Sequence, residues 1–550
     1  MAIGTTRRAG LPVLGAPREM PAAAAELSAD ATRVVLVTLG CDKNTVDSER
    51  LLARLAGAGV RVVGDASSAD IVVINTCGFI DVAKEESVDA ILDAVRLKQD
   101  GRIRAVVAMG CMVQRYKTEL EAELPEVDLF LGLTEADRLV PELRARGLLS
   151  EQSVPTMEQP LRLLSTSTPH TSHLKISEGC DHTCAFCAIP LMRGKHRSTP
   201  IEALVREAQQ LEAGGVVELN LISQDTTWYG RDILRGTAGT GGEWFVGRTF
   251  AGMAGFTAGA RITDLDTATA AIGRAADPAG GRTRDAAAGV ATATGSFPVT
   301  VAGAARRHGL LPELLDALLA GTTIPWLRLF YMYPSGIYPA LVEQIAREPR
   351  IVPYIDMPIQ HGSDSVLKRM RRPERQATIR ERVSWLREAI PDVALRTTVI
   401  VGFPGETDDE FEDMLTLLEE IRFDHLGAFS YSEEESTPAA VMPDQVDAAV
   451  KRERLERVLE LQAAIAQERN ERWIGREVVV LIDAVTGRDM DDPDAVTGER
   501  GAVGRTAWQA LEIDGVVYID DATGAKPGDF VKVRIVDVIE TDLKAVAVDN

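Results

Sequence analysis

The sequence is short of cysteine, of basic residues and of long apolar stretches, and each shortage excludes a class of protein. Six cysteines in 550 residues are too few for a disulfide framework, so we expect a reducing, cytoplasmic compartment with thiols free to bind metal. Lys and Arg number 60 against 82 Asp and Glu, and this net charge of −22 argues against holding nucleic acid by bulk positive charge. No run of about 18 uncharged apolar residues occurs, so no membrane span is expected.

The chain is long enough for several domains, and hydrophobic residues make up 45% of it. Residues 1–31 lack the continuous apolar core of a signal peptide, so a disordered tail is predicted there, with a misassigned start codon as the alternative. Residues 32–150 alternate apolar segments with helical patterns, which predicts an α/β domain with a parallel sheet covered on both faces. Three of the apolar segments are each followed by a cysteine, at the strand ends where ligands collect in such sheets. These cysteines are Cys41, Cys77 and Cys111.

A second alternating block, residues 165–440, contains six strand candidates and predicts an incomplete (βα)6 barrel with its chemistry at the carboxyl ends of the strands. Gly, Ala and Thr make up more than half of residues 237–305, which predicts a flexible insertion or, alternatively, a partly helical lid. Residues 441–472 are helical with mixed charges and predict a connector. Residues 473–548 are rich in strand patterns with Gly and Asp at the turns, which predicts a small all-β barrel of the OB type.

The strongest chemical signal is the motif Cys180-x3-Cys184-x2-Cys187. Three thiolates within eight residues can hold one side of a [4Fe–4S] cluster and leave one iron open to a small molecule. A structural zinc site is the alternative, and it needs a fourth ligand nearby, for which His182 and His196 are candidates.

This motif resembles the cluster loop of the radical S-adenosylmethionine (SAM) superfamily, in which the open iron binds the amino and carboxylate groups of SAM. The resemblance implies that Phe186 lies near the adenine and that Ser223 and Gln224 lie near the SAM amino group. It also implies that Arg396 and Gly402 belong to the strand segment that backs the SAM. Considered alone, Gln224 could instead be a buried amide that closes a loop, and Arg396 could form a barrel salt bridge.

The other three cysteines lie far apart in sequence, but a parallel sheet would bring the loops that carry them together as a second cluster site. Three separate buried thiols are the alternative. Two three-cysteine sets in this order resemble the methylthiotransferase family, which has an N-terminal cluster domain, a radical SAM barrel and a C-terminal TRAM domain. The resemblance covers roughly Val34 to Val548 apart from the insertion, although Asp42 stands where the family usually has Pro.

Within that family, the sequence resembles the members that modify a ribosomal protein more than those that modify tRNA. The segments that carry this resemblance are CDKNTVDSE, NTCGFID, LKISEGC, ISQDTTWYG and MPIQHGSD. Residues 473–550 contain 16 acidic and eight basic residues, whereas a TRAM domain that binds tRNA should be basic. An acidic domain favours a basic protein partner, and a merely solvated acidic surface is the alternative.

The resemblance implies an enzyme that adds a methylthio group to the β-carbon of an aspartate in small-subunit ribosomal protein twelve. It implies two [4Fe–4S] clusters and SAM as cofactors: the barrel cluster reduces SAM, the resulting radical abstracts hydrogen, the N-terminal cluster presents sulfur, and a second SAM supplies the methyl group. No side chain is assigned as a general acid or base, and no electron donor is identified. Methylthiolation of a tRNA adenosine is the nearest alternative. A plain radical SAM methylase and an iron–sulfur scaffold protein are more distant ones, and the first leaves Cys41, Cys77 and Cys111 without a role.

Overall fold

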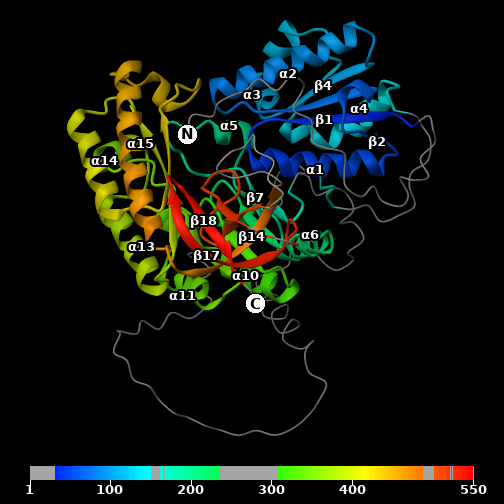
Figure 1. Cartoon of the computed structure of the whole chain (residues 1–550). Coiled ribbons are helices and arrows are strands. Elements are labelled where there is room, and N and C mark those ends of the chain that lie inside the picture. The colour runs from blue at the N-terminus through cyan, green and yellow to red at the C-terminus, as the bar shows by residue number, and fades with distance from the viewer. Residues whose placement is uncertain are drawn as a thin grey trace.

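The computed structural model describes residues 31–149, 161–164, 168–235, 308–486, 501–520, 522 and 524–548. The predicted insertion over 237–305 lies outside the described residues, as does the predicted tail apart from Ala31. The domain boundaries predicted at residues 150 and 165 also fall on residues outside this set and stay predictions. The described residues form a parallel-sheet part, a second part built as an open barrel, and a small closed β-barrel (Figure 1).

The N-terminal part is a parallel sheet with helices on both faces, which confirms the predicted fold of this region. Its strands run in the order β2-β1-β3-β4-β5. Helices α1 and α4 cover one face and α2 and α3 the other, so β3 and β4 are buried throughout their length. The elements are β1 Arg33–Thr38, α1 Asp42–Gly57, β2 Arg61–Val62, β3 Ile71–Thr76, α2 Asp81–Gln99, β4 Ala105–Gly110, α3 Cys111–Glu123, β5 Leu129–Gly132 and α4 Leu139–Ala145.

The second part contains six parallel strands in the order β13-β12-β11-β10-β9-β6, as expected for a (βα)6 partial barrel. Its strands are β6 Thr171–Lys175, β9 Glu218–Ile222, β10 Trp326–Leu329, β11 Ile351–Asp356, β12 Ala394–Val401 and β13 His425–Ser430. Its helices are α6 Ile201–Ala213, α7 Arg231–Leu234, α10 Leu311–Gly321, α11 Pro339–Arg347, α12 Asp364–Arg369, α13 Gln376–Ala389 and α14 Asp408–Ile421. Helix α15, Ala448–Glu471, packs on β13 and α14 and so extends the outer helical layer.

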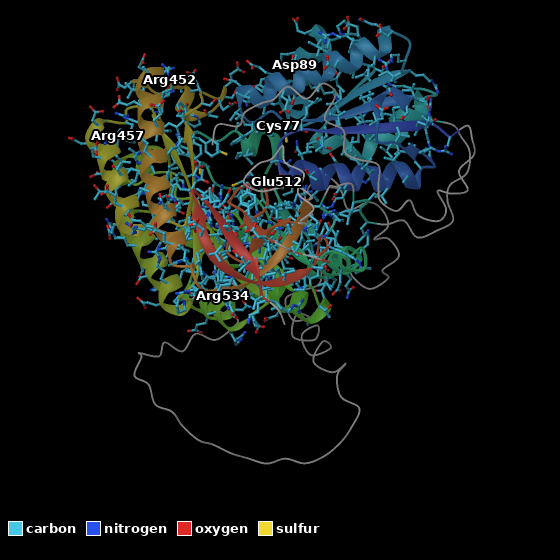
Figure 2. All side chains as sticks on the ribbon, viewed as in Figure 1. Cys77, Asp89, Arg452, Arg457, Glu512 and Arg534 are labelled. Atoms are coloured by element: carbon cyan, nitrogen blue, oxygen red, sulfur yellow. The ribbon has the colours of Figure 1, made fainter. Side chains whose placement is uncertain are left out.

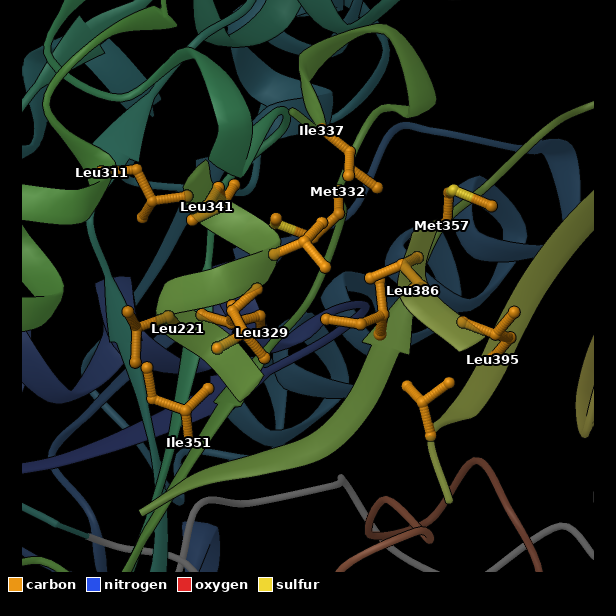
Figure 3. Close-up of a cluster of buried hydrophobic side chains, with 14 of the residues drawn as sticks. Leu221, Leu311, Leu329, Met332, Ile337, Leu341, Ile351, Met357, Leu386 and Leu395 are labelled. Carbon is orange, nitrogen blue, oxygen red and sulfur yellow. The ribbon is translucent and has the colours of Figure 1, made fainter. Parts of the chain in front are cut away.

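The main core of the barrel lies between its strands and these outer helices. Alternate strand residues such as Leu221, Leu329 and Leu395 point outward and meet Leu341 and Leu386 from α11 and α13 (Figure 3). This alternation follows from the period of two in a β-strand. The intervening residues therefore face the inside of the barrel.

The C-terminal part is a closed five-stranded barrel in the order β14-β15-β16-β18-β17. Its strands are β14 Glu477–Thr486, β15 Gly501–Thr506, β16 Val517–Asp520, β17 Phe530–Ile539 and β18 Asp542–Ala547. Its Leu481 and Phe530 pack against Trp326 and Tyr354, so this small barrel covers part of the inner face of the large one. At the same joint, the buried carboxylate of Glu218 pairs with Arg328 and Arg505, each at 2.7 Å.

Candidate functional site

The three N-terminal cysteines lie on loops that leave adjacent strands of one parallel sheet. Cys41 follows β1, Cys77 follows β3, and Cys111 is the first residue of α3 directly after β4. In the strand register, Thr38 pairs with Asn75 and Thr76 pairs with Gly110, so the three strands end at nearly the same level. The topology therefore brings together cysteines that are distant in sequence.

Glycine lets these loops approach one another more closely than other residues would allow. Gly110 has φ +106°, and a Cβ at this position would lie 2.4 Å from the Asn75 Oδ1. A Cβ at Gly40 would lie 2.8 Å from the Cys77 Sγ, and one at Gly78 would lie 2.7 Å from the Met112 Cα. These distances are shorter than any normal carbon contact, so each junction between neighbouring loops requires glycine.

Buried Asn44, in the first turn of α1, contacts all three loops. Its backbone N–H donates to the Cys41 carbonyl at 2.8 Å, and its Nδ2 donates to the Thr76 carbonyl at 3.2 Å. Its Oδ1 accepts a hydrogen bond from the Cys111 Sγ at 3.6 Å. One amide side chain thus ties the cysteine loops into a single unit.

The barrel cysteines lie on one loop between β7, Ser177–Glu178, and the short helix α5, Ile189–Arg193. At the start of this loop, Gly179 has φ +71°, and a Cβ there would lie 2.2 Å from the Lys195 carbonyl oxygen. The loop therefore folds back tightly on the segment that leads into β8, Arg197–Ser198. Cys180 and Cys184 are buried, and Cys187 is partly exposed.

Aromatic and polar side chains surround the barrel loop. The Cys184 Sγ lies 4.0 Å from the Tyr333 hydroxyl and 3.9 Å from the Arg372 Nη1. His182 stacks on Tyr333 with ring centroids 4.3 Å apart, and its Nε2 lies 2.7 Å from the Asp225 Oδ2. These contacts fix the loop and keep His182 hydrogen-bonded to a carboxylate.

Burial keeps most of these thiols neutral in the metal-free chain. Burial first, with a smaller contribution from the neighbouring cysteines of the loop, raises the pKa of Cys180 and of Cys187 to about 12. Burial likewise raises the pKa of Cys111 to about 12, and Cys41 and Cys77 add to this effect although Arg193 opposes it. A metal that binds thiolate must therefore displace these protons as it binds.

The arrangement fits an iron–sulfur cluster better than a single metal ion. Within the described part of the chain, no three His, Cys, Asp or Glu side chains converge closely enough to hold one ion. A closed zinc site needs four ligands around one ion, whereas each thiolate of a [4Fe–4S] cluster binds a different iron, so the ligands stand farther apart. Of the two candidate zinc ligands, His182 has its Nε2 2.7 Å from the Asp225 carboxylate, and His196 has its Nε2 3.1 Å from the Ser198 hydroxyl. The Nδ1 of His196 is buried without a hydrogen-bond partner among the described residues.

The N-terminal cysteine set borders the barrel through Cys111. Cys111 belongs to one hydrophobic cluster with Ala188 and Met192. Ala188 directly follows Cys187, and Met192 lies in α5. Figure 2 shows Cys77 where the N-terminal part meets the rest of the molecule. The sequence predicts that each set lies at strand ends, but the structure is needed to show that Cys111 packs beside the residues that follow Cys187.

Four of the five predicted SAM-binding residues lie in loops beside the barrel cysteines or at carboxyl ends of strands. Ser223 and Gln224 follow β9, and Gly402, with φ +71°, follows β12. The Ser223 hydroxyl lies 2.5 Å from that of Ser177, whereas both polar atoms of the Gln224 amide are buried without a hydrogen-bond partner among the described residues. Phe186 packs against the cluster that contains Phe403 and Tyr431. An orphaned buried amide is costly, and a polar ligand would satisfy it.

Arg396, the fifth residue, is engaged in ion pairs. Its Nη1 lies 2.9 Å from the Asp356 Oδ1, and its Nε lies 3.5 Å from Asp514 of the C-terminal barrel. The structure therefore gives this guanidinium the barrel salt bridge that the sequence left open as its alternative role. It also shows a partner from another domain, Asp514, which no pattern in the sequence identifies.

Comparison with known proteins identifies the family. Family models match residues 33–132 (Uncharacterized protein family UPF0004), 305–418 (Radical SAM superfamily) and 474–548 (TRAM domain). The chain is 42% identical over 522 residues to the ribosomal protein uS12 methylthiotransferase RimO of Anaeromyxobacter sp. (strain Fw109-5), covering 93% of this chain and 92% of the relative. The RimO protein of a second Anaeromyxobacter, strain K, is 43% identical over the same shares of both chains. That of Geobacter sulfurreducens is 39% identical over 93% of this chain and 97% of the relative.

The chain belongs to the RimO family. These proteins are radical SAM methylthiotransferases, and membership confirms the three-part organisation and the enzyme class predicted from the two cysteine sets. It also favours the ribosomal-protein members of the wider family over the tRNA-modifying ones. The family matches give residue ranges and do not assign individual cluster or SAM ligands.

Sequence reasoning missed the polar residues that join the two cysteine sets. These residues are Asn44, Asp47, Lys175, Glu178 and Arg193, and they are connected by hydrogen bonds and ion pairs. One signal was available in the sequence. Asn44 and Asp47 are three residues apart in a predicted helix, so both side chains lie on the same face of it. That helix follows Cys41, a predicted cluster ligand.

Proposed function

We propose that this protein is a ribosomal protein uS12 methylthiotransferase, which adds a methylthio group to the β-carbon of an aspartate. The observation that carries the proposal is the packing of Cys111, from one three-cysteine set, on Ala188 and Met192 beside the loop of the other set, in a chain of the RimO family. A plain radical SAM methylase has no use for the second set. Methylthiolation of a tRNA adenosine is not favoured, because the similar proteins named above are uS12 enzymes.

We further propose that Cys180, Cys184 and Cys187 hold one [4Fe–4S] cluster and that Cys41, Cys77 and Cys111 hold a second. When bound, the clusters and SAM supply the radical and sulfur chemistry that no amino-acid side chain can provide at an unactivated C–H bond. The role of the protein chain is to position the clusters and SAM and to shield them from solvent. Tyr333 and Arg372 pack beside the Cys184 thiol and shield it from solvent.

The SAM site is proposed to lie over the carboxyl ends of the barrel strands. The unpartnered Gln224 amide supports it, since it offers both a donor and an acceptor to a ligand with amino and carboxylate groups. We assign Phe186, Ser223 and Gly402 to the same site because they lie in the neighbouring loops. Arg396, held between two carboxylates, is assigned a supporting place behind it.

The protein partner is proposed to be basic, with no direct binding of nucleic acid and no membrane association. In the C-terminal barrel, Asp483 and Asp514 face the large barrel and pair with His170, Arg396 and Arg505. The attraction must therefore come from the other acidic residues of this domain. They include Asp489, Asp491, Asp492, Asp494 and Asp521, which lie outside the described residues, together with exposed Asp520.

The cytoplasm is proposed as the compartment, supported by the absence of any disulfide among the six cysteines, all of which lie in the described residues. No helix in the described part of the chain is long and apolar enough to cross a membrane. The physiological electron donor is left unassigned.

The test is mass spectrometry of ribosomal protein twelve and of total tRNA from a strain that lacks the gene. We expect the methylthio group to disappear from one aspartate of the ribosomal protein and to return when the gene is restored. Restoring a gene with Cys41, Cys77 and Cys111 changed to Ala should fail. A modified ribosomal protein together with loss of methylthio-adenosine from tRNA would contradict the proposal.

A further inference from the structure

A buried polar cluster joins the two cysteine sets directly. Arg193 ends helix α5 of the barrel, and its side chain crosses to helix α1 of the N-terminal part. Its Nη2 donates to the Asn44 Oδ1 at 2.5 Å, and its Nη1 donates to Asp47 at 3.1 Å and to Glu178 at 2.9 Å. Lys175 pairs with the same two carboxylates. Arg193 is 2% exposed, so these bonds form away from water.

The two ends of this bridge are each fixed to a different cysteine set. On the barrel side, α5 is five residues long and begins two residues after Cys187, so little chain separates that cysteine from Arg193. On the N-terminal side, Asn44 bonds to the Cys41 carbonyl, the Thr76 carbonyl and the Cys111 thiol. A displacement of Arg193 would therefore move the second set relative to the first.

We propose that Arg193 is a positioning residue that sets the placement of the Cys41, Cys77 and Cys111 set relative to the Cys180, Cys184 and Cys187 set, acting through Asn44. This inference rests on the proposed function, in which a radical made at one set must be matched by sulfur presented at the other. Reactions of this kind depend steeply on distance, and a misplacement of about 1 Å can cost on the order of a hundredfold in rate.

Arginine suits this place better than lysine for a geometric reason. A planar guanidinium directs one nitrogen to the amide and another to the carboxylates at the same time, whereas an ammonium is a single point of charge. Arg193→Lys keeps the positive charge in the cluster but cannot keep both directions. The substitution therefore separates positioning from electrostatics.

A second ion pair across the same junction provides a matched control. Arg50, also on α1, pairs with Glu207 of α6 at 2.8 Å. Both side chains are at most 12% exposed, and no hydrogen bond described for either of them reaches a cysteine loop. Arg50→Lys should weaken the junction without changing how the two cysteine sets meet.

The experiment compares wild type, Arg193→Lys and Arg50→Lys as full-length, anaerobically reconstituted proteins with ribosomal protein twelve and SAM. For each we would measure the 5′-deoxyadenosine released per methylthiolated product, together with the electron paramagnetic resonance spectrum of the reduced clusters. In Arg193→Lys we expect that ratio to rise by on the order of tenfold to a hundredfold, while SAM cleavage itself continues. The signal of the N-terminal cluster should shift, that of the barrel cluster should not, and Arg50→Lys should resemble wild type.

A second arm uses metal-free protein and so does not depend on activity. Because the Cys111 thiol is held against Asn44, a thiol reagent should modify Cys111 faster in Arg193→Lys than in wild type or Arg50→Lys. If Arg193→Lys does not fold, Asn44→Asp replaces it, since it keeps the acceptor for Arg193 but loses the Nδ2–H donors to Leu39 and Thr76.

The outcomes distinguish this inference from the proposed function. Wild type that cleaves SAM but never modifies the ribosomal protein would overturn the proposed function. Wild type that modifies it, with an unchanged ratio in Arg193→Lys or an equal rise in Arg50→Lys, would overturn only the positioning role. Equal labelling of Cys111 in all three metal-free proteins would also overturn that role.

Discussion

The two cysteine sets perform related work but are built in different ways. The barrel set comes from one loop of eight residues, whereas the N-terminal set is assembled from three loops spread between Cys41 and Cys111. A short loop needs little beyond its own conformation to present its thiols. The dispersed set requires a correctly registered sheet, close glycine contacts and a central amide. The difference suggests that damage to the fold of the N-terminal part should remove the second set first.

The largest effects on iron content and activity are expected when either set of three thiols is removed. Changing Cys180, Cys184 and Cys187 to Ala should leave about four of about eight irons per chain and abolish SAM cleavage. Changing Cys41, Cys77 and Cys111 to Ala should leave a similar iron content but spare SAM cleavage and stop methylthiolation. Iron assay and chromatography of 5′-deoxyadenosine measure both. Cleavage that survives loss of the barrel set would overturn its assignment to SAM.

The joint between the barrel and the C-terminal domain tests whether either set depends on the stability of the whole chain. Burial alone would raise the pKa of Glu218, but Arg505 and Arg328 outweigh it and hold the pKa at about 2. Glu218→Gln leaves the buried guanidinium of Arg328 without its carboxylate, whereas Arg505 keeps Asp483. Removal of one partner from a buried pair costs about 3–5 kcal/mol. We expect a clearly lower melting temperature by calorimetry at neutral pH. Iron content should stay unchanged, since Glu218 begins β9 and the cysteines lie near the opposite ends of the strands.

The pH dependence of this effect has a definite sign. Because the folded-state pKa is depressed, the stabilisation by Glu218 is complete above about 4.5, its ordinary value, and is lost as pH falls toward about 2. The melting temperatures of metal-free wild type and Glu218→Gln should therefore converge as the solution is acidified through that interval. A constant difference down to pH 3 would contradict the assignment of the effect to this carboxylate.

The two cysteine sets differ in how much of their arrangement the sequence alone predicts. The spacing of Cys180, Cys184 and Cys187 indicates a cluster loop on its own, since the ligands are local. Apolar segments followed by Gly and Cys predict that the other three cysteines converge, because parallel strands share one carboxyl edge. The contact of Cys111 with Met192 and the ion pair of Arg396 with Asp514 join separate domains. No periodicity within one segment encodes such contacts, so they required the structure.

A matched pair of glycine substitutions should each weaken the binding of one cluster and spare the other, with a smaller effect than removal of the thiols. Gly110→Ala places a side chain against the Asn75 amide at a backbone conformation that other residues rarely adopt, and Gly179→Ala does the same against the Lys195 carbonyl. Each strained residue costs about 1–3 kcal/mol. We expect Gly110→Ala to deplete the N-terminal cluster and Gly179→Ala the barrel cluster, each measured by electron paramagnetic resonance. If both variants lost the same cluster, the separate support of the two sets would be refuted.

The smallest effect is expected at the edge of the N-terminal sheet that is remote from its cysteines. Asp70 accepts bonds from the Arg33 backbone N–H at 2.7 Å and from its guanidinium at 2.9 Å, where β1 and β3 begin. Bonding to the Arg33 side chain holds the pKa of Asp70 below its ordinary value, so its contribution is present at neutral pH and fades as acid protonates it. The pair is partly exposed, and solvent screens such pairs so that they contribute little to stability. Asp70→Asn should therefore lower the denaturation midpoint slightly and leave both clusters and the methylthiolation rate intact. If this distant change emptied the N-terminal cluster, the dispersed set would depend on the sheet as a whole and not on the glycines and Asn44 at its carboxyl edge.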